Sequence, residues 1–175
     1  MQIPDQFQKP IYLDNAATSW PKPEAVYTAV DNWQRNNGTA AGRSSCRRAQ
    51  ESGAIVNRAR RLVATLFNSP QSDCIVFTHN GTDSLNIVLH GLLQPGDRVV
   101  TTAAEHNSVL RPLRELQSCG VSTEVVPVDA TGRLDWEAFR QALQAPTRLV
   151  VMTHASNVTG TIQPIAEARD RKSVV

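Results

Sequence analysis

The spacing of apolar and polar positions along this chain switches repeatedly between the period of a strand and that of a helix. Strands are predicted where apolar and β-branched residues run together, at 11–17, 74–79, 98–103, 122–128 and 148–156. Helices are predicted where apolar residues recur on one face, after Pro23 and at 45–67, 81–93, 108–118 and 134–143. The expected inward-facing residues are Ile55, Leu62, Val63 and Leu66 on the second of these helices, and Val109, Leu110, Leu113 and Leu116 on the fourth.

Strands that alternate with helices of ten or more residues are typical of parallel β-α-β units. We therefore expect an α/β fold, with three layers in the order α/β/α and a mostly parallel sheet. In such sheets, ligands bind beyond the carboxyl ends of the strands. Three segments that follow predicted strands carry compact polar residues there: THNGTDS (78–84), TTAAEHNS (101–108) and THASNVTGT (153–161).

Composition narrows the class of protein further. The 175 residues are 41% hydrophobic and 19% charged, with a mean hydropathy of −0.30, as in a soluble globular chain of about one domain. A net charge of +2 gives no reason to expect nucleic acid, and no apolar run approaches the roughly 18 residues that a membrane helix needs. The three scattered cysteines do not have the spacing of metal ligands, so we expect no metal site. Their odd number does not indicate a disulfide framework, which fits a protein of the reducing cytoplasm. The first ten residues lack a signal-peptide layout, which agrees with a cytoplasmic protein.

The start of the helix at 81–93 is a candidate anion site. Gly81 lets the backbone approach a ligand, and Thr82, Asp83 and Ser84 fall in the first helical turn. The N–H groups of that turn have no partner within the helix, and the helix dipole favours an anion there by about 0.3–1 kcal/mol. Simple helix capping by the same residue types is the alternative, and this turn alone favours it.

Two further polar residues follow the neighbouring strands. His106, beside Glu105, has an imidazole that can stack on a flat ring and carry protons near neutral pH. Asn157 has an amide that can bond to a ring substituent, although a turn stabilised by Asn and Gly explains it equally well. Together, the three strand ends predict one pocket.

Four segments resemble a known family when they are taken in order: IYLDNAATSWPKPEAV, VFTHNGTDSLN, EHNSVLRPL and THASNVTGTIQPIAE. They are similar to the first half of class V aminotransferase-fold enzymes, specifically the cysteine desulfurase family, over residues 11–167. The resemblance implies the large domain of PLP-dependent transferase fold type I, with pyridoxal 5'-phosphate (PLP) as cofactor. Such enzymes remove sulfur from L-cysteine to give L-alanine and an enzyme persulfide, and they are homodimers that can pass sulfur to an acceptor protein.

The same resemblance implies a role for each candidate residue. Gly81, Thr82 and Asp83 would bind the PLP phosphate, with the N–H groups of Thr82 and Asp83 as donors and the Asp83 side chain turned away to cap its own helix. His106 would be the catalytic residue that stacks on the pyridine ring and assists proton transfer. Asn157 would lie beside the ring's phenolic oxygen or the substrate, and Ala16 would line the substrate's approach.

Several parts of the family's catalytic machinery are missing from this chain. Its three lysines, Lys9, Lys22 and Lys172, do not stand at the family position of the Schiff-base lysine. The ring-nitrogen aspartate and the nucleophilic cysteine come later in family sequences. We therefore expect an inactive N-terminal fragment with an arm at 1–20 and a partial PLP-binding large domain at 21–169.

The last residues depart from the family's pattern. The segment DRKSVV can be back-translated to a sequence that resembles a common sequencing-library adapter. We expect residues 170–175 to be an anomalous tail left by a shortened gene model, with a natural chain end as the alternative.

Two other functions remain open. The first is another class V reaction on the same cofactor, as in an aminotransferase, epimerase or selenocysteine lyase. The second is a non-enzymatic α/β module that binds a phosphorylated small molecule or a protein partner.

Overall fold

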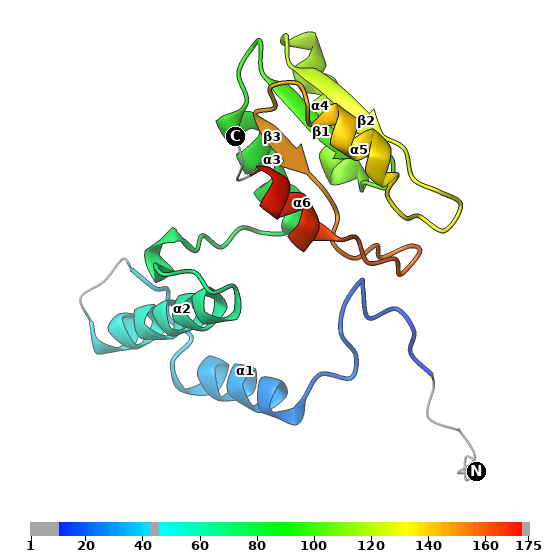
Figure 1. The fold of residues 1–175 in the computed structure, drawn as a ribbon. Coiled ribbons are helices and arrows are strands. Elements are labelled where there is room, and N and C mark those ends of the chain that lie inside the picture. The colour runs from blue at the N-terminus through cyan, green and yellow to red at the C-terminus, as the bar shows by residue number, and fades with distance from the viewer. Residues whose placement is uncertain (1–10, 43–45, 173–175) are drawn as a thin grey trace. The chain divides into compact units, whose positions relative to one another are not determined.

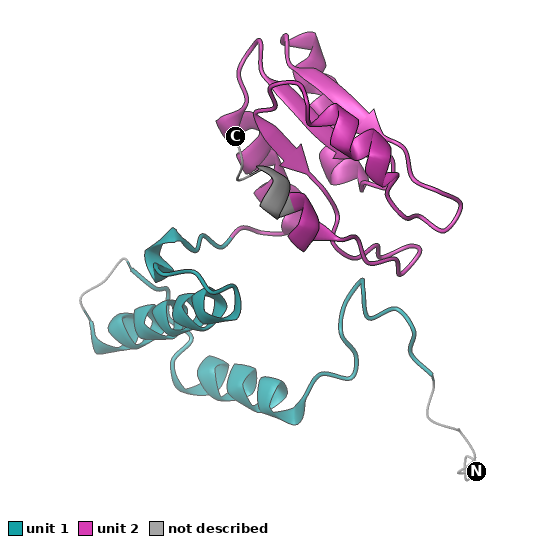
Figure 2. Ribbon diagram, viewed as in Figure 1, with its two compact units in different colours: residues 1–77 teal, residues 78–175 magenta. Residues whose placement is uncertain are grey.

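The computed structural model describes residues 11–42 and 46–172, and it divides into two compact units, residues 1–77 and 78–175 (Figure 2). The domain boundaries expected after residues 20 and 169 stay a prediction. Residues 173–175, half of the expected tail, lie outside the described residues. None of the helices in the described ranges is both long and apolar enough to cross a membrane.

In the first unit, the described residues form two α-helices, α1 (Glu24–Asn36) and α2 (Arg47–Leu66), and the short 3-10 helix η1 (Ser72–Cys74). Both α-helices lie where the sequence predicts them. The buried positions of α2 are small residues, Ala49, Ser52 and Ala64, while Ile55, Leu62 and Leu66 are exposed, so the expected inner face of this helix is wrong. Ser52 takes part in the packing because its hydroxyl donates to the carbonyl of Thr39 at 2.9 Å.

Two predicted strands do not form. Residues 11–17 contain a turn in which the Tyr12 hydroxyl bonds to the carbonyls of Asp14 and Thr18. Residues 75–78 are extended in places but pair with no strand among the described residues, and Val76 and Phe77 are exposed. Strand propensity reflects packing against neighbours, so a strand-like sequence without such neighbours stays irregular.

The second unit is built on a three-stranded sheet with the order β2-β1-β3. The strands are β1 (Arg98–Thr102), β2 (Ser122–Val126) and β3 (Leu149–Val151). Both neighbours run parallel to β1, with Val100 opposite Glu124 on one side and Val150 on the other. The prediction of a parallel sheet is therefore confirmed, although β3 is shorter than expected.

Helices cover both faces of this sheet (Figure 1). On one face pack α3 (Gly81–Leu92) and α4 (Asn107–Ser118), and on the other α5 (Trp136–Ala142) and α6 (Ile165–Lys172). The first core contains Leu89, Leu93, Val99, Val109, Leu113, Leu116 and Val121, and the second contains Val100, Val126, Phe139 and Ala142. The three-layer α/β/α fold is confirmed, and α6 is an element that the apolar spacing does not predict.

Candidate functional site

The start of α3 is held by Asn80, which is the N-cap residue of the helix. Its side-chain Oδ1 accepts from the Asp83 N–H at 2.8 Å, and its carbonyl accepts from the Ser84 N–H at 3.2 Å. The hydroxyls of Thr78 and Ser84 lie 2.6 Å apart and brace the turn. Of the first four N–H groups of α3, those of Gly81 and Thr82 have no partner among the described residues.

These bonds correct two details expected of Asp83. Its N–H is already engaged by Asn80, so the open donors are those of Gly81 and Thr82. Its carboxylate does not cap the helix, because Oδ2 lies 3.2 Å from Nδ1 of His79. Asn and Asp are both good capping residues, and here the extended backbone of Asn80 gives it the capping role.

His106 is the N-cap residue of α4 and stands directly after the β1 loop. Its Nδ1 accepts from the Ser108 N–H at 3.1 Å and lies 2.8 Å from the Ser108 hydroxyl. A ring nitrogen that accepts carries no proton, so the neutral ring holds its proton on Nε2. The exposed imidazole is thus fixed by Nδ1, while its Nε2 makes no hydrogen bond with another of the described residues.

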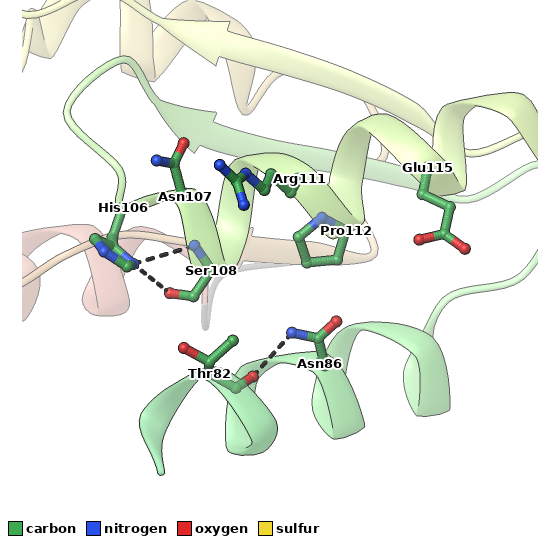
Figure 3. A pocket seen from close by; sticks show the side chains of 8 residues that line it. All are labelled: Thr82, Asn86, His106, Asn107, Ser108, Arg111, Pro112 and Glu115. Carbon is green, nitrogen blue, oxygen red and sulfur yellow. Dashed lines mark hydrogen bonds between the residues drawn. The ribbon is translucent and has the colours of Figure 1, made fainter.

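A pocket of about 310 Å³ lies between α3 and α4 (Figure 3). It is lined by Thr82 and Asn86 from α3, by the N-cap residue His106, and by Asn107, Ser108, Arg111, Pro112 and Glu115 along α4. The volume is at the lower end of the range for small-molecule sites. The structure therefore brings together Thr82 and His106, two residues that are far apart in the sequence.

Of the eight lining residues, only Thr82 and His106 were named as site residues from the sequence; Arg111 and Asn86 are two that were missed. Arg111 adds a positive charge and lies one helical turn beyond Asn107, so the spacing of four residues is a signal that places it on the same face. Asn86 donates to the Thr82 carbonyl at 2.9 Å and lies one turn into α3. An anionic ligand in this pocket would meet the Arg111 cation and the open end of α3, while the Glu115 carboxylate lines the pocket farther along α4.

Asn157 does not line this pocket. It is exposed in a turn of the loop that follows β3, where Ala155 and Ile162 form an isolated antiparallel bridge. The Gln163 N–H closes the loop by donating to the His154 carbonyl at 2.8 Å. Because β3 neighbours β1, the loops bearing Asn157 and His106 leave the same edge of the sheet.

Ala16 belongs to the first unit. It lies in the turn where the Ala17 N–H donates to the Asp14 carbonyl at 3.2 Å, and it is exposed. Its expected place beside the substrate stays a prediction.

Glu105 is a buried carboxylate beside His106, with 8% of its surface exposed. Its Oε1 accepts from the Thr102 hydroxyl at 2.7 Å and from the Thr153 N–H at 2.8 Å. Its Oε2 accepts from the Thr153 hydroxyl at 2.7 Å. The side chain therefore joins the loop after β1 to the segment after β3.

A second polar cluster holds the turn after β2. The Thr131 hydroxyl and the Arg133 N–H bond to the Asp129 carboxylate and lower its pKa below the ordinary value of 3.8. The buried Gln163 side chain accepts from the Leu134 N–H at 3.1 Å and donates to the Gly132 carbonyl at 2.6 Å. These contacts fasten the end of the loop that carries Asn157 to this turn.

The chain matches the family model described as aminotransferase class-V over residues 11–173. A cysteine desulfurase from Bradyrhizobium diazoefficiens is 41% identical over 159 residues, which cover 89% of this chain and 40% of that protein. In the described part of the chain, no three or more histidine, cysteine, aspartate or glutamate side chains lie together in a group that could hold a metal ion.

Two solved structures are similar in fold as well as in sequence. The apo structure of cysteine desulfurase from Thermococcus onnurineus NA1 has a TM-score of 0.83 and 32% identity, covering 93% of this chain and 42% of its own. The cysteine desulfurase CsdA from Escherichia coli has a TM-score of 0.71 and 33% identity, covering 91% of this chain and 41% of its own. The chain therefore spans about two fifths of the length of these relatives.

Proposed function

Because the chain belongs to the class V aminotransferase family, we propose that it is the N-terminal part of a PLP-dependent cysteine desulfurase-like enzyme. The family uses PLP, and the relatives described above are cysteine desulfurases. The whole enzyme would remove sulfur from L-cysteine and leave L-alanine and an enzyme persulfide. It would act in the cytoplasm as a homodimer and pass sulfur to an acceptor protein.

The observation that carries this proposal is the pocket shared by Thr82 and His106. The open N–H groups of Gly81 and Thr82 suit the phosphate of PLP, since hydrogen-bond donors at a helix N-terminus bind anions. A side chain at position 81 would meet nothing within 4 Å, so the space in front of these donors is open. The donor set and the free space fit a phosphorylated ligand.

The other site residues would orient the ligand and move a proton. When bound, PLP supplies an electron sink for the substrate carbon. The imidazole of His106, held through Nδ1, would stack on the flat ring and exchange a proton through Nε2. Asn157 would donate to the ring's phenolic oxygen or to the substrate, and Ala16 would line the substrate's approach.

We further propose that the residues described do not supply the covalent chemistry. None of the eight residues lining the pocket is a lysine, and Lys22 donates to the Ser19 carbonyl at 2.9 Å in the first unit. We therefore expect the 175-residue chain to bind PLP without turnover. It should release no alanine from cysteine, and borohydride should trap no adduct at a single lysine.

The test is a titration of the isotope-labelled 175-residue chain with PLP and, separately, with inorganic phosphate. PLP should shift the amide signals of Gly81 and Thr82 together with the imidazole signals of His106. Inorganic phosphate should shift only the two amides, because it has no ring to contact the imidazole. Equal responses to both ligands would favour the phosphate-binding module, and PLP-induced shifts elsewhere would refute the proposed site.

A further inference from the structure

Glu105 is an unusual group for the interior of this unit. It is 8% exposed, and no cation lies within ion-pair distance of it in the described part of the chain. Three hydrogen bonds, from Thr102 and from the N–H and hydroxyl of Thr153, balance its carboxylate. Burying a charge is costly, and an apolar side chain would fill the same space more cheaply. We therefore expect that the carboxylate is kept because its hydrogen bonds fix the segments that they join in one arrangement.

The hydrogen bonds between Glu105 and Thr153 lie just beyond the end of the paired strands β1 and β3. The pairing of β1 with β3 covers only three residues on each strand and stops at Thr101 opposite Val151. Thr153 lies two residues beyond that point. Among the hydrogen bonds of the described residues, those of Glu105 are the ones that join the two loops past the paired strands.

The loop after β3 has a second anchor at its other end. Gln163 donates its N–H to the His154 carbonyl, and its side chain bonds to the turn after β2. Asn157 lies between the two anchors, and its side chain makes no hydrogen bond with another of the described residues. Of the two anchors, Glu105 is the one that also adjoins His106.

We infer that Glu105 is a positioning residue that holds the Asn157 loop at a fixed place relative to His106. The inference is about geometry within residues 78–175, and its catalytic meaning rests on the proposed function. Glu105 itself would touch neither cofactor nor substrate. It would act by tying the backbone of Thr153 to the segment that ends in His106.

Two variants of Glu105 show whether the loop is held by hydrogen bonds to this side chain or only by its charge or its burial. In Glu105→Gln, the amide oxygen still accepts from Thr102 and from the Thr153 N–H, while the amide nitrogen donates to the Thr153 hydroxyl, which can also accept. Glu105→Ala removes all three bonds. The alanine variant should shift the amide signals of residues 154–158 and lower their order parameters from about 0.85 toward 0.6. The glutamine variant should keep the wild-type values.

Two more variants test whether Glu105 and Thr153 act through the same link and control for the loss of a carboxylate elsewhere. Thr153→Val removes one of the three bonds, and combining it with Glu105→Ala should add little, because both changes break the same link. Glu124→Ala removes a carboxylate that bridges β2 to Arg98 of β1, away from these loops. This control should leave residues 154–158 unchanged. If Glu105→Ala does not fold, Thr153→Val carries the test on the same signals.

A ligand measurement connects the geometry to the site. If the loop is correctly placed in about a tenth of the Glu105→Ala molecules, their affinity for PLP falls about tenfold. Affinity for inorganic phosphate should not change, and Glu105→Gln should restore PLP binding. Unchanged loop signals in Glu105→Ala, or a glutamine variant that behaves like alanine, would overturn the inference. Failure of the wild-type chain to bind PLP would refute the proposed function, while the loop signals would still decide the role of Glu105.

Discussion

Replacing Gly81 by alanine should stabilise this chain and weaken its binding of PLP. Gly81 is the first residue of α3, and a Cβ built there meets nothing within 4 Å. Its φ is not in the left-handed region, so alanine can adopt the native backbone without strain. Gly→Ala at such a compatible position raises the free energy of unfolding by about 0.4–1 kcal/mol.

The opposite effect on binding follows from where the new methyl group would stand. The Cα–Cβ bonds of a helix tilt toward its N-terminus, so the methyl group would enter the space in front of the open N–H groups of Gly81 and Thr82. A hydrogen bond to a charged group contributes about 1.5–3 kcal/mol. Loss of one such bond to the phosphate would raise the Kd for PLP by roughly 10- to 150-fold.

Gly91 offers a matched control in the same helix. It lies near the other end of α3, and a Cβ there also meets nothing within 4 Å. Gly91→Ala should raise the urea midpoint of unfolding without changing the Kd for PLP, which is measured by titration. If Gly81→Ala gains stability and binds PLP as tightly as Gly91→Ala, the phosphate does not sit at this helix tip.

Three further predictions concern stability. Asn80→Ala removes the acceptor for the Asp83 N–H and should cost about 1 kcal/mol, measured by urea unfolding. Leu113→Ala opens a cavity at a position that is 2% exposed and should cost about 2–5 kcal/mol in the same assay. Asp129→Asn should destabilise the chain at neutral pH, and the difference from wild type should vanish as the pH falls below about 3.8 through the lowered pKa of Asp129.

Each of these has its own control. Asn80→Ser should keep most of the cap, since a serine hydroxyl also accepts from the N–H groups of the first turn. Leu92→Ala, at a position with 47% exposure, should change stability far less than Leu113→Ala. For Asp129, the direction of the shift fixes the sign of the pH dependence. A carboxyl with a lowered pKa stabilises the fold above its ordinary pKa of 3.8, and this stabilisation is lost as the pH falls through the lowered pKa. A stability difference for Asp129→Asn that grew on acidification would contradict the role of the turn.

Local patterns in the sequence were sufficient for α1 to α5 and for the class of the fold, but not for η1 or α6. The helical spacing of Val109, Leu110, Leu113 and Leu116 predicted a buried face, and all but the half-buried Leu110 are buried. This succeeds because the period of a helix is set by neighbours within four residues along the chain. Of the three polar loops predicted to form one pocket, two supply Thr82 and His106 to it, while Asn157 from the third does not line it.

The same reasoning failed where an element depends on pairing with a segment that is distant in the sequence. Residues 74–79 have a strand-like composition, but no neighbouring strand pairs with them in the described residues. The capping role passed from Asp83 to Asn80 because the backbone of one residue, and not its type, decides which side chain reaches the helix end.

What the sequence determined by itself is therefore the order of α1 to α5 and β1 to β3, the parallel α/β fold and the chemical types present at the ends of the strands. Tertiary structure alone decided which of those groups meet. Glu105 bonds to Thr153 across 48 residues of chain, and Thr82 meets His106 because α3 packs beside α4. Hydrogen bonds and pockets depend on distances in space, and a local pattern of residues contains no information on distances between segments that only packing brings together.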